Sequence, residues 1–131
     1  MIKRIIELSI MVFLFYSCVT PAPINIKGRY FLENDDLGRY LGYQTNQPEI
    51  SLVLVDHYVF AAGYNDNFIV AIQHPQKSSG ESVDSNYYIV PFRNKFTYSP
   101  RDGIIGPLTF EAYKLKMEQL GIGQITWVKL K

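Results

Sequence analysis

The stretch HYVFAAGYNDNFIVAIQH, residues 57–74, decides the fold class of this chain. Two apolar arms, 58–64 and 68–74, flank the polar triplet Asn65-Asp66-Asn67. Asn and Asp adopt the backbone conformations of a tight reversal readily, and aromatic and β-branched residues favour strands. The pattern therefore predicts an antiparallel hairpin, and Pro75 ends its second arm.

The segments on either side of this hairpin carry further strand patterns. The nearly continuous apolar run 49–55 predicts a buried central strand, and the polar run 75–85 predicts a mobile surface loop. Residues 96–108 contain two Pro and two Gly, so we expect an extended, partly buried connection there. The remaining predicted strands are 28–33, 86–92 and 124–131, whereas 37–44 is a weaker candidate because of its two glycines.

One helix is predicted, over about residues 109–120. Thr109 is a suitable N-cap, and Gly121 is well placed to end the helix. The apolar residues that share one face of this helix are Phe110, Tyr113, Met117 and Leu120. The expected fold class is therefore α+β, with this helix packed on one face of a mostly antiparallel sheet of five or six strands.

Composition limits the size of the fold and the classes of partner. A chain of 131 residues fits one domain, and its 47% hydrophobic content is enough for a core. The formal net charge is +1, with no basic run. This argues against nucleic-acid binding, because that needs a concentrated Lys/Arg surface.

The first 18 residues differ from the rest of the chain. Lys3 and Arg4 precede an apolar run, 8–16, that is shorter than the ~20 residues of a membrane span. The run ends at Ser17 and Cys18, the only cysteine of the chain. A basic start, an apolar run and a small residue directly before cysteine are similar to a bacterial lipoprotein signal.

This similarity implies a division of the chain and a location. It implies a signal peptide over residues 1–17 and acyl chains on Cys18. With the strand and helix patterns above, it leaves a linker over 18–27 and a single α+β domain over 28–131. The acyl chains would anchor the protein to a membrane of the bacterial envelope. The uncharged residues after Cys18 favour the periplasm-facing side of the outer membrane.

Two positions in this segment depart from the usual lipoprotein signal. Phe15 and Tyr16 stand where such signals have a leucine and a small residue, respectively. An ordinary secretory signal and an uncleaved N-terminal anchor therefore remain alternatives.

Few residues point to catalysis. No nucleophile elbow, phosphate loop, zinc spacing or nucleotide fingerprint occurs, so no cofactor is expected. Asp56 and His57 lie near one end of the predicted hairpin, and His74 lies at the same end. Together they could bind a metal ion or exchange a proton, or they could simply be polar residues that terminate strands. The cluster at residues 34–36, Asn-Asp-Asp, predicts a turn, because it lacks the spacing of a calcium loop.

The aromatic residues supply a candidate binding surface. Aromatics make up 15% of the chain. Those that cluster late in the sequence include Tyr87, Tyr88, Phe92 and Tyr98. Alternation along a strand would send about half of them to solvent, where tyrosine commonly contacts other proteins. The alternative is that most of them lie in the core or form cross-strand pairs.

Three segments together resemble a family of small, uncharacterised bacterial lipoproteins. They are FIVAIQHP (68–75), NYYIVPF (86–92) and IIGPLTFEAYKLKMEQLGI (104–122). The shared features are a strand that ends in Gln-His-Pro, a Tyr-Tyr-Ile strand and a Gly-Pro-Leu start of a helix. The resemblance implies an envelope lipoprotein with an α+β domain and supplies no activity, substrate or catalytic residue.

Three functions are consistent with these observations. The first is a non-catalytic module that binds an envelope protein, as an inhibitor, immunity or assembly factor. The second is a small metal-binding or acid–base enzyme that uses His57 and His74. The third is a structural component of the envelope.

Overall fold

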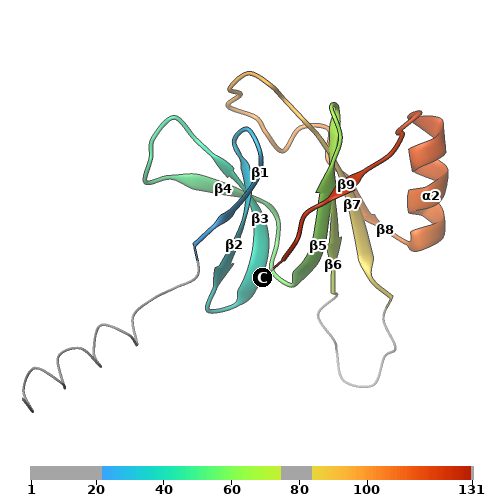
Figure 1. Ribbon diagram of the computed structural model, residues 1–131, viewed down its shortest axis with the longest axis horizontal. Coiled ribbons are helices and arrows are strands. Elements are labelled where there is room, and N and C mark those ends of the chain that lie inside the picture. Colours follow the sequence, from blue (N-terminus) through green and yellow to red (C-terminus); the bar gives the residue numbers. More distant parts are fainter. Residues whose placement is uncertain (1–21, 75–83, 131) are drawn as a thin grey trace, which may run out of the picture.

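The chain forms two antiparallel sheets, and the computed structural model describes residues 22–74 and 84–130. The first sheet is a meander of β1 (Ile24–Lys27), β2 (Tyr30–Asp35), β3 (Gly38–Gln44) and β4 (Ser51–Val55). The second sheet has the order β8-β7-β6-β5-β9. Its strands are β5 (Val59–Tyr64), β6 (Phe68–Gln73), β7 (Asn86–Pro91), β8 (Ile105–Leu108) and β9 (Thr126–Trp127). Figure 1 shows the two sheets side by side, with the helix on the far side of the second sheet.

The hairpin predicted from residues 57–74 is confirmed as β5 and β6. Tyr64 pairs with Ile69 next to the reversal. The side-chain oxygen of Asn65 accepts hydrogen bonds from the backbone N–H groups of Asn67 at 2.9 Å and Phe68 at 2.8 Å. The polar triplet thus closes the reversal through its own side chain, which explains why Asn suits this position.

A hydrophobic core fills the space between the two sheets. The first sheet contributes Ile26, Tyr30, Leu32, Leu41, Tyr43 and Val55, and the second contributes Val59, Ala62, Ile69, Ala71 and Val90. Residues alternate between two sides of β6: Ile69 and Ala71 face this core, whereas Val70 belongs to a second cluster under the helix. The molecule therefore has three layers, in the order sheet, sheet, helix.

The predicted helix is confirmed as α2 (Phe110–Gln119), together with both of its ends. The Thr109 hydroxyl accepts a hydrogen bond from a first-turn N–H at 3.2 Å. Gly121 adopts φ 62°, and the Ile122 N–H donates to the Met117 carbonyl at 2.9 Å. This is a Schellman ending, which favours glycine because of the positive φ.

Only part of the predicted apolar face of α2 is buried. Tyr113 is buried against the second sheet, and Met117 packs on the same cluster. Phe110 and Leu120 are 48% and 40% exposed, respectively. The helix therefore covers its sheet with a narrower stripe than the sequence predicts.

The prediction of one sheet with five or six strands is wrong in the number of sheets and strands. The run 49–55 yields β4, which is an edge strand and not a central one. After β4 the chain turns away through residues 56–58 and starts the second sheet, and none of the later strands that the structure describes pairs with the outer edge of β4. The Arg101 side chain covers part of that edge by donating to the Val53 carbonyl at 3.0 Å.

Three smaller differences concern segments with weak strand signals. β1 lies inside the predicted linker 18–27, and β8 lies inside the predicted connection 96–108. The final strand, predicted over 124–131, is reduced to the two residues of β9. Short edge strands of this kind pair through the backbone and need little hydrophobic pattern.

Buried tyrosine hydroxyls close one end of the interface between the two sheets, which we call the seam. Tyr30 is fully buried, and its hydroxyl donates to the Pro91 carbonyl at 3.2 Å and accepts from the Arg93 N–H at 3.1 Å. The Tyr43 hydroxyl accepts from the Thr97 N–H at 3.1 Å. We call this region, where the connection after β7 crosses the seam, the closed end.

Several predictions concern segments outside the described residues. The signal peptide at 1–17, the acylation of Cys18 and most of the loop at 75–85 fall in this class. Among residues 22–74 and 84–130, no helix is long and apolar enough to cross a membrane.

Candidate functional site

The other end of the seam carries the candidate site, where the chain passes from β4 to β5. The passage consists of Asp56, His57 and Tyr58. Tyr58 has φ 77°, a conformation that costs a bulky L-residue roughly 1–3 kcal/mol. Its carbonyl accepts a hydrogen bond from the His74 N–H at 2.9 Å, which ties the strained residue to the end of β6. We call this region the open end.

Gln73 holds this passage in place. Its side-chain Nε2 donates to the carbonyls of Asp56 at 3.0 Å and His57 at 3.1 Å. Its Oε1 accepts from Asn86 Nδ2 at 3.1 Å and from the Tyr88 hydroxyl at 3.2 Å. A primary amide has two donor hydrogens and two acceptor lone pairs, so all four positions of this buried side chain are used.

His57 lies between two carboxylates. Its Nδ1 is 2.6 Å from Asp56 Oδ1, and its Nε2 is 2.8 Å from Asp35 Oδ2 at the end of β2. A carboxylate only accepts hydrogen bonds, so both contacts form together only when both ring nitrogens carry protons. The geometry therefore selects the imidazolium form, which links the first sheet to the passage between the sheets.

We call Asp35, Asp56 and His57 the triad. Their contacts shift all three pKa values in the direction that favours the charged forms. The hydrogen bond to Asp35 raises the pKa of His57 above its ordinary value of 6.5. The same bond lowers the pKa of Asp35, and the His57 backbone N–H lowers the pKa of Asp56. The Tyr40 ring lies edge-on to the imidazole at 5.4 Å. Burial raises the pKa of Tyr40 to about 12, so this neighbour is neutral.

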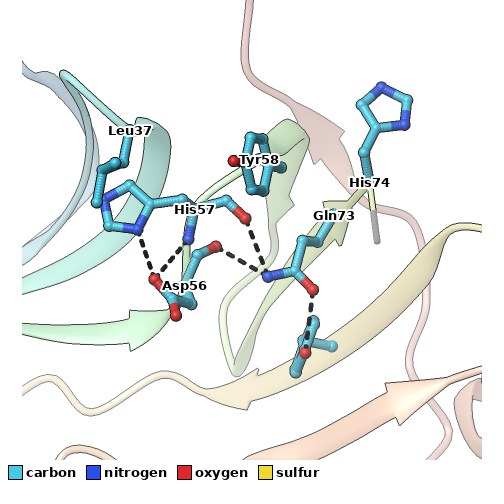
Figure 2. A pocket seen from close by; sticks show the side chains of 7 residues that line it. Leu37, Asp56, His57, Tyr58, Gln73 and His74 are labelled. Carbon is cyan, nitrogen blue, oxygen red and sulfur yellow. Dashed lines mark hydrogen bonds and ion pairs between the residues drawn. The ribbon is translucent and has the colours of Figure 1, made fainter. Parts of the chain in front are cut away.

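The two histidines do not form a joint site. The His74 ring stacks on Phe60 with centroids 4.0 Å apart, and Figure 2 shows it directed away from the His57 ring. His57 has no free lone pair for a proton or a metal ion while both its nitrogens are protonated. Within residues 22–74 and 84–130, no group of three His, Cys, Asp or Glu side chains is placed to hold a metal ion. The structure therefore brings Asp56 to His57, as the sequence suggests, and leaves His74 apart.

A pocket of about 480 Å³ opens beside these residues. Its lining comes from the first sheet, the passage and the second sheet: Leu37, Asp56, His57, Tyr58, Gln73, His74 and Tyr88. Figure 2 shows Leu37 and His57 on one side and Gln73 and His74 on the other, with Tyr58 between them. The pocket is therefore built from both halves of the molecule.

The four aromatic residues of the predicted binding surface lie in different places. Tyr87 stacks on Tyr113 beneath α2, with centroids 4.8 Å apart. Tyr88 points to the other side of β7 and lines the pocket, and Phe92 packs on Tyr30 in the core. Tyr98 is 86% exposed near the closed end. The structure does not bring these four side chains to one surface.

Sequence reasoning missed three contributors to the open end. Asp35 is in the predicted turn cluster, but its partner His57 is 22 residues away and belongs to the passage between the sheets. Tyr58 gives no signal, because an αL residue in such a place is normally Gly, Asn or Asp. Gln73 could have been found, since it continues the alternation of Ile69 and Ala71 and so points into the seam.

Comparison with known proteins places the chain in a family without assigning an activity. No curated protein and no solved structure matches it. A family model described as "Protein of unknown function (DUF3997)" matches residues 28–131. The match covers most of the chain and nearly all of the two-sheet domain, so the chain belongs to the DUF3997 family of proteins of unknown function.

Proposed function

We propose that this protein is a lipid-anchored protein of the bacterial envelope that acts as a non-catalytic binding module. The observation that carries the binding role is the pocket at the open end of the seam, of about 480 Å³. Pockets of this size that collect residues from several elements are the usual places for recognition. An inhibitor, an immunity factor and an assembly partner would each use such a surface.

The alternative of a metal-binding or acid–base enzyme has less support from the same residues. His57 is engaged at both nitrogens by Asp35 and Asp56, and His74 stacks on Phe60. A general base needs a free lone pair, and a metal site needs convergent ligands. Neither requirement is met by the arrangement of these two histidines.

The anchoring role rests on the N-terminal sequence and on the place where the domain begins. Lys3, Arg4, the apolar run 8–16 and Cys18 follow the order of a lipoprotein signal. The first strand starts at Ile24. A stretch of six residues can span at most about 20 Å, so acyl chains on Cys18 would keep the domain close to the membrane surface.

Mass spectrometry of the mature protein tests the anchor. The protein is produced in a bacterial host, extracted from membranes and compared with the variants Cys18→Ala and Ser17→Ala. We expect wild type and Ser17→Ala to begin at an acylated residue 18, because both keep a small residue before the cysteine. The Cys18→Ala protein should either be lost from the membrane fraction or keep its uncleaved signal peptide. An unmodified Cys18 in wild type, or cleavage elsewhere, would overturn the anchoring proposal.

Site-directed photocrosslinking tests the binding role. A photoreactive phenylalanine analogue replaces Leu37 at the pocket or Leu115 on α2, which are 65% and 57% exposed, respectively. The matched exposure makes Leu115 the control for nonspecific reaction. We expect a discrete crosslinked protein with the analogue at position 37 and none at 115. Equal patterns at both positions, or no product at 37, would contradict a binding role for the open end.

A further inference from the structure

We propose that the pocket at the open end receives the side chain of a lysine or arginine from the partner protein. This inference rests on the proposed binding role and adds the chemistry of the contact. It follows from the charge of the triad beside the pocket, from the apolar side chains around the pocket and from the hydrogen bonds that its polar groups already make.

The charge of the triad beside the pocket is negative: Asp56 and His57 line the pocket, and Asp35 contacts the His57 ring. Two carboxylates, Asp35 and Asp56, accompany one imidazolium, His57, which leaves one net negative charge for the triad. The Asp56 side chain is 78% exposed and that of Asp35 is 47% exposed, whereas the His57 side chain is only 17% exposed. The negative groups therefore face solvent more than the positive one does. Among the residues that the structure describes, the lining includes no Lys or Arg to neutralise them.

The walls suit the long apolar stem of a basic side chain. Leu37 is 65% exposed and Tyr58 is 42% exposed, and both line the same pocket as Asp56. Methylene groups of Lys or Arg pack on such surfaces while the charged head reaches a carboxylate. A cation near the face of a tyrosine ring gains a further electrostatic attraction.

The surroundings suit a protein partner. Phe60, which stacks on the pocket residue His74, is itself 38% exposed. Together with Leu37 and Tyr58 it gives the pocket an apolar border. A charged anchor surrounded by apolar contacts that exclude water is the usual form of an interface hot spot, and Arg is enriched at such positions.

Other ligand classes fit less well. An anion would meet the exposed Asp56 carboxylate, whereas the His57 imidazolium is only 17% exposed and is already paired with two carboxylates. A neutral sugar would gain no charge attraction from the triad, and Gln73 is not free to bind its hydroxyls because it already makes four hydrogen bonds within the protein. A cation with an apolar stem uses the groups that remain accessible.

A titration with a minimal probe tests this inference. N-acetyl-L-arginine amide is added to the ¹⁵N-labelled domain and followed by two-dimensional NMR. N-acetyl-L-citrulline amide, which has nearly the same shape and no charge, is the matched control. We expect the arginine probe to shift resonances of residues 37, 56–58 and 73–74 with a dissociation constant on the order of millimolar, as for a single side chain. Citrulline should shift them at least about tenfold less at equal concentration.

Two variants locate the contact. Asp56→Asn should weaken arginine binding about tenfold, while Glu118→Gln on α2 should leave it unchanged. Asp56 also contacts His57, so a second variant, Leu37→Lys, keeps all three residues of the triad. It places a competing cation on an exposed turn and should abolish binding. Equal shifts by citrulline, or full arginine binding by both Asp56→Asn and Leu37→Lys, would overturn the inference.

The outcome separates this inference from the proposed function. If photocrosslinking at position 37 captures a partner but the arginine probe does not bind, the binding role stands and the chemistry proposed for the pocket is wrong. If the probe binds and no partner is captured, the pocket chemistry stands and the binding role fails.

Discussion

The two ends of the seam between the sheets are held in different ways. At the closed end, Tyr30 and Tyr43 are fully buried and make neutral hydrogen bonds to the backbone of the connection after β7. At the open end, the charged triad and Gln73, whose side chain uses all its hydrogen-bonding positions, hold the strained passage beside a pocket. The difference teaches that neutral, buried contacts and charged, partly exposed contacts are separated along the same pair of sheets. Variants of the two ends should therefore differ in how much they change the free energy of unfolding and in how that change depends on pH.

The largest expected effect comes from the closed end. Tyr30→Ala removes a fully buried ring that contacts Tyr43 and Phe92, and should lower the free energy of unfolding by about 3–5 kcal/mol. Tyr30→Phe keeps the ring and loses only the hydroxyl, so it should cost about 1–3 kcal/mol. Urea unfolding followed by circular dichroism measures both. A Tyr30→Ala cost no larger than that of Tyr30→Phe would mean that packing of the ring contributes little at this end.

The second effect concerns the glutamine of the open end. Gln73→Leu leaves the carbonyls of Asp56 and His57 without their partner and should lower the free energy of unfolding by about 1–3 kcal/mol. Gln119→Leu, at the exposed end of α2, is the control and should change it by less than about 0.5 kcal/mol. The two variants are compared by urea unfolding. Equal small effects would show that Gln73 does not hold the passage.

The third effect is smaller and depends on pH. The folded pKa of His57 is raised above 6.5, so its contribution is fully present below pH 6.5 and is lost as the pH rises through the folded value. The pKa values of Asp35 and Asp56 are lowered from 3.8, so their contributions are present above 3.8 and are lost as the pH falls through the folded values. The triad should therefore stabilise most between these limits.

A variant of His57 separates the pH dependence caused by the triad from that caused by other ionisable groups. The groups that face His57 are the two carboxylates, the neutral Tyr40 ring from β3 and, behind it, Glu33, which accepts from the Tyr40 hydroxyl at 2.6 Å. His57→Gln should lose stability relative to wild type at about pH 5.5, and the difference should shrink at about pH 8.5. His74→Gln is the control. A constant difference between wild type and His57→Gln at both pH values would contradict the charged form of His57.

The smallest effect is expected at Tyr98. Its side chain is 86% exposed near the closed end and contacts the Phe96 ring edge-on at 4.8 Å. Tyr98→Ala should change the free energy of unfolding by less than about 0.5 kcal/mol, because little area is lost from the core. The same urea experiment measures it. A cost above about 1 kcal/mol would show that the closed end extends further along this connection than Tyr30 and Tyr43.

The parts of the fold that the sequence predicts correctly are those with local signals. The β5–β6 hairpin follows from the triplet at 65–67, and both ends of α2 follow from Thr109 and Gly121. Each of these signals acts on residues only a few positions away, so the local sequence alone determines the turn or the helix end. The division into two sheets does not follow from such a signal.

The division depends instead on contacts between distant residues. The passage at 56–58 looks like the start of a strand, and only Gln73, Asp35 and the positive φ of Tyr58 show that the chain turns there. The run 49–55 is apolar enough for a central strand, and it becomes an edge strand because the chain leaves the sheet after it. Non-local partners of this kind leave no periodic pattern in the sequence.

The protonation of His57 tests the central claim most directly, because the open end as described requires a cation between two carboxylates. A ¹⁵N NMR titration of the ring nitrogens measures it in the intact domain, with Asp35→Asn as the matched variant. We expect both ring nitrogens of wild type to carry protons at pH 6.5, with a pKa above that value, and the pKa to fall in Asp35→Asn. A neutral ring at pH 6.5, with one nitrogen unprotonated and no response to Asp35→Asn, would contradict the account.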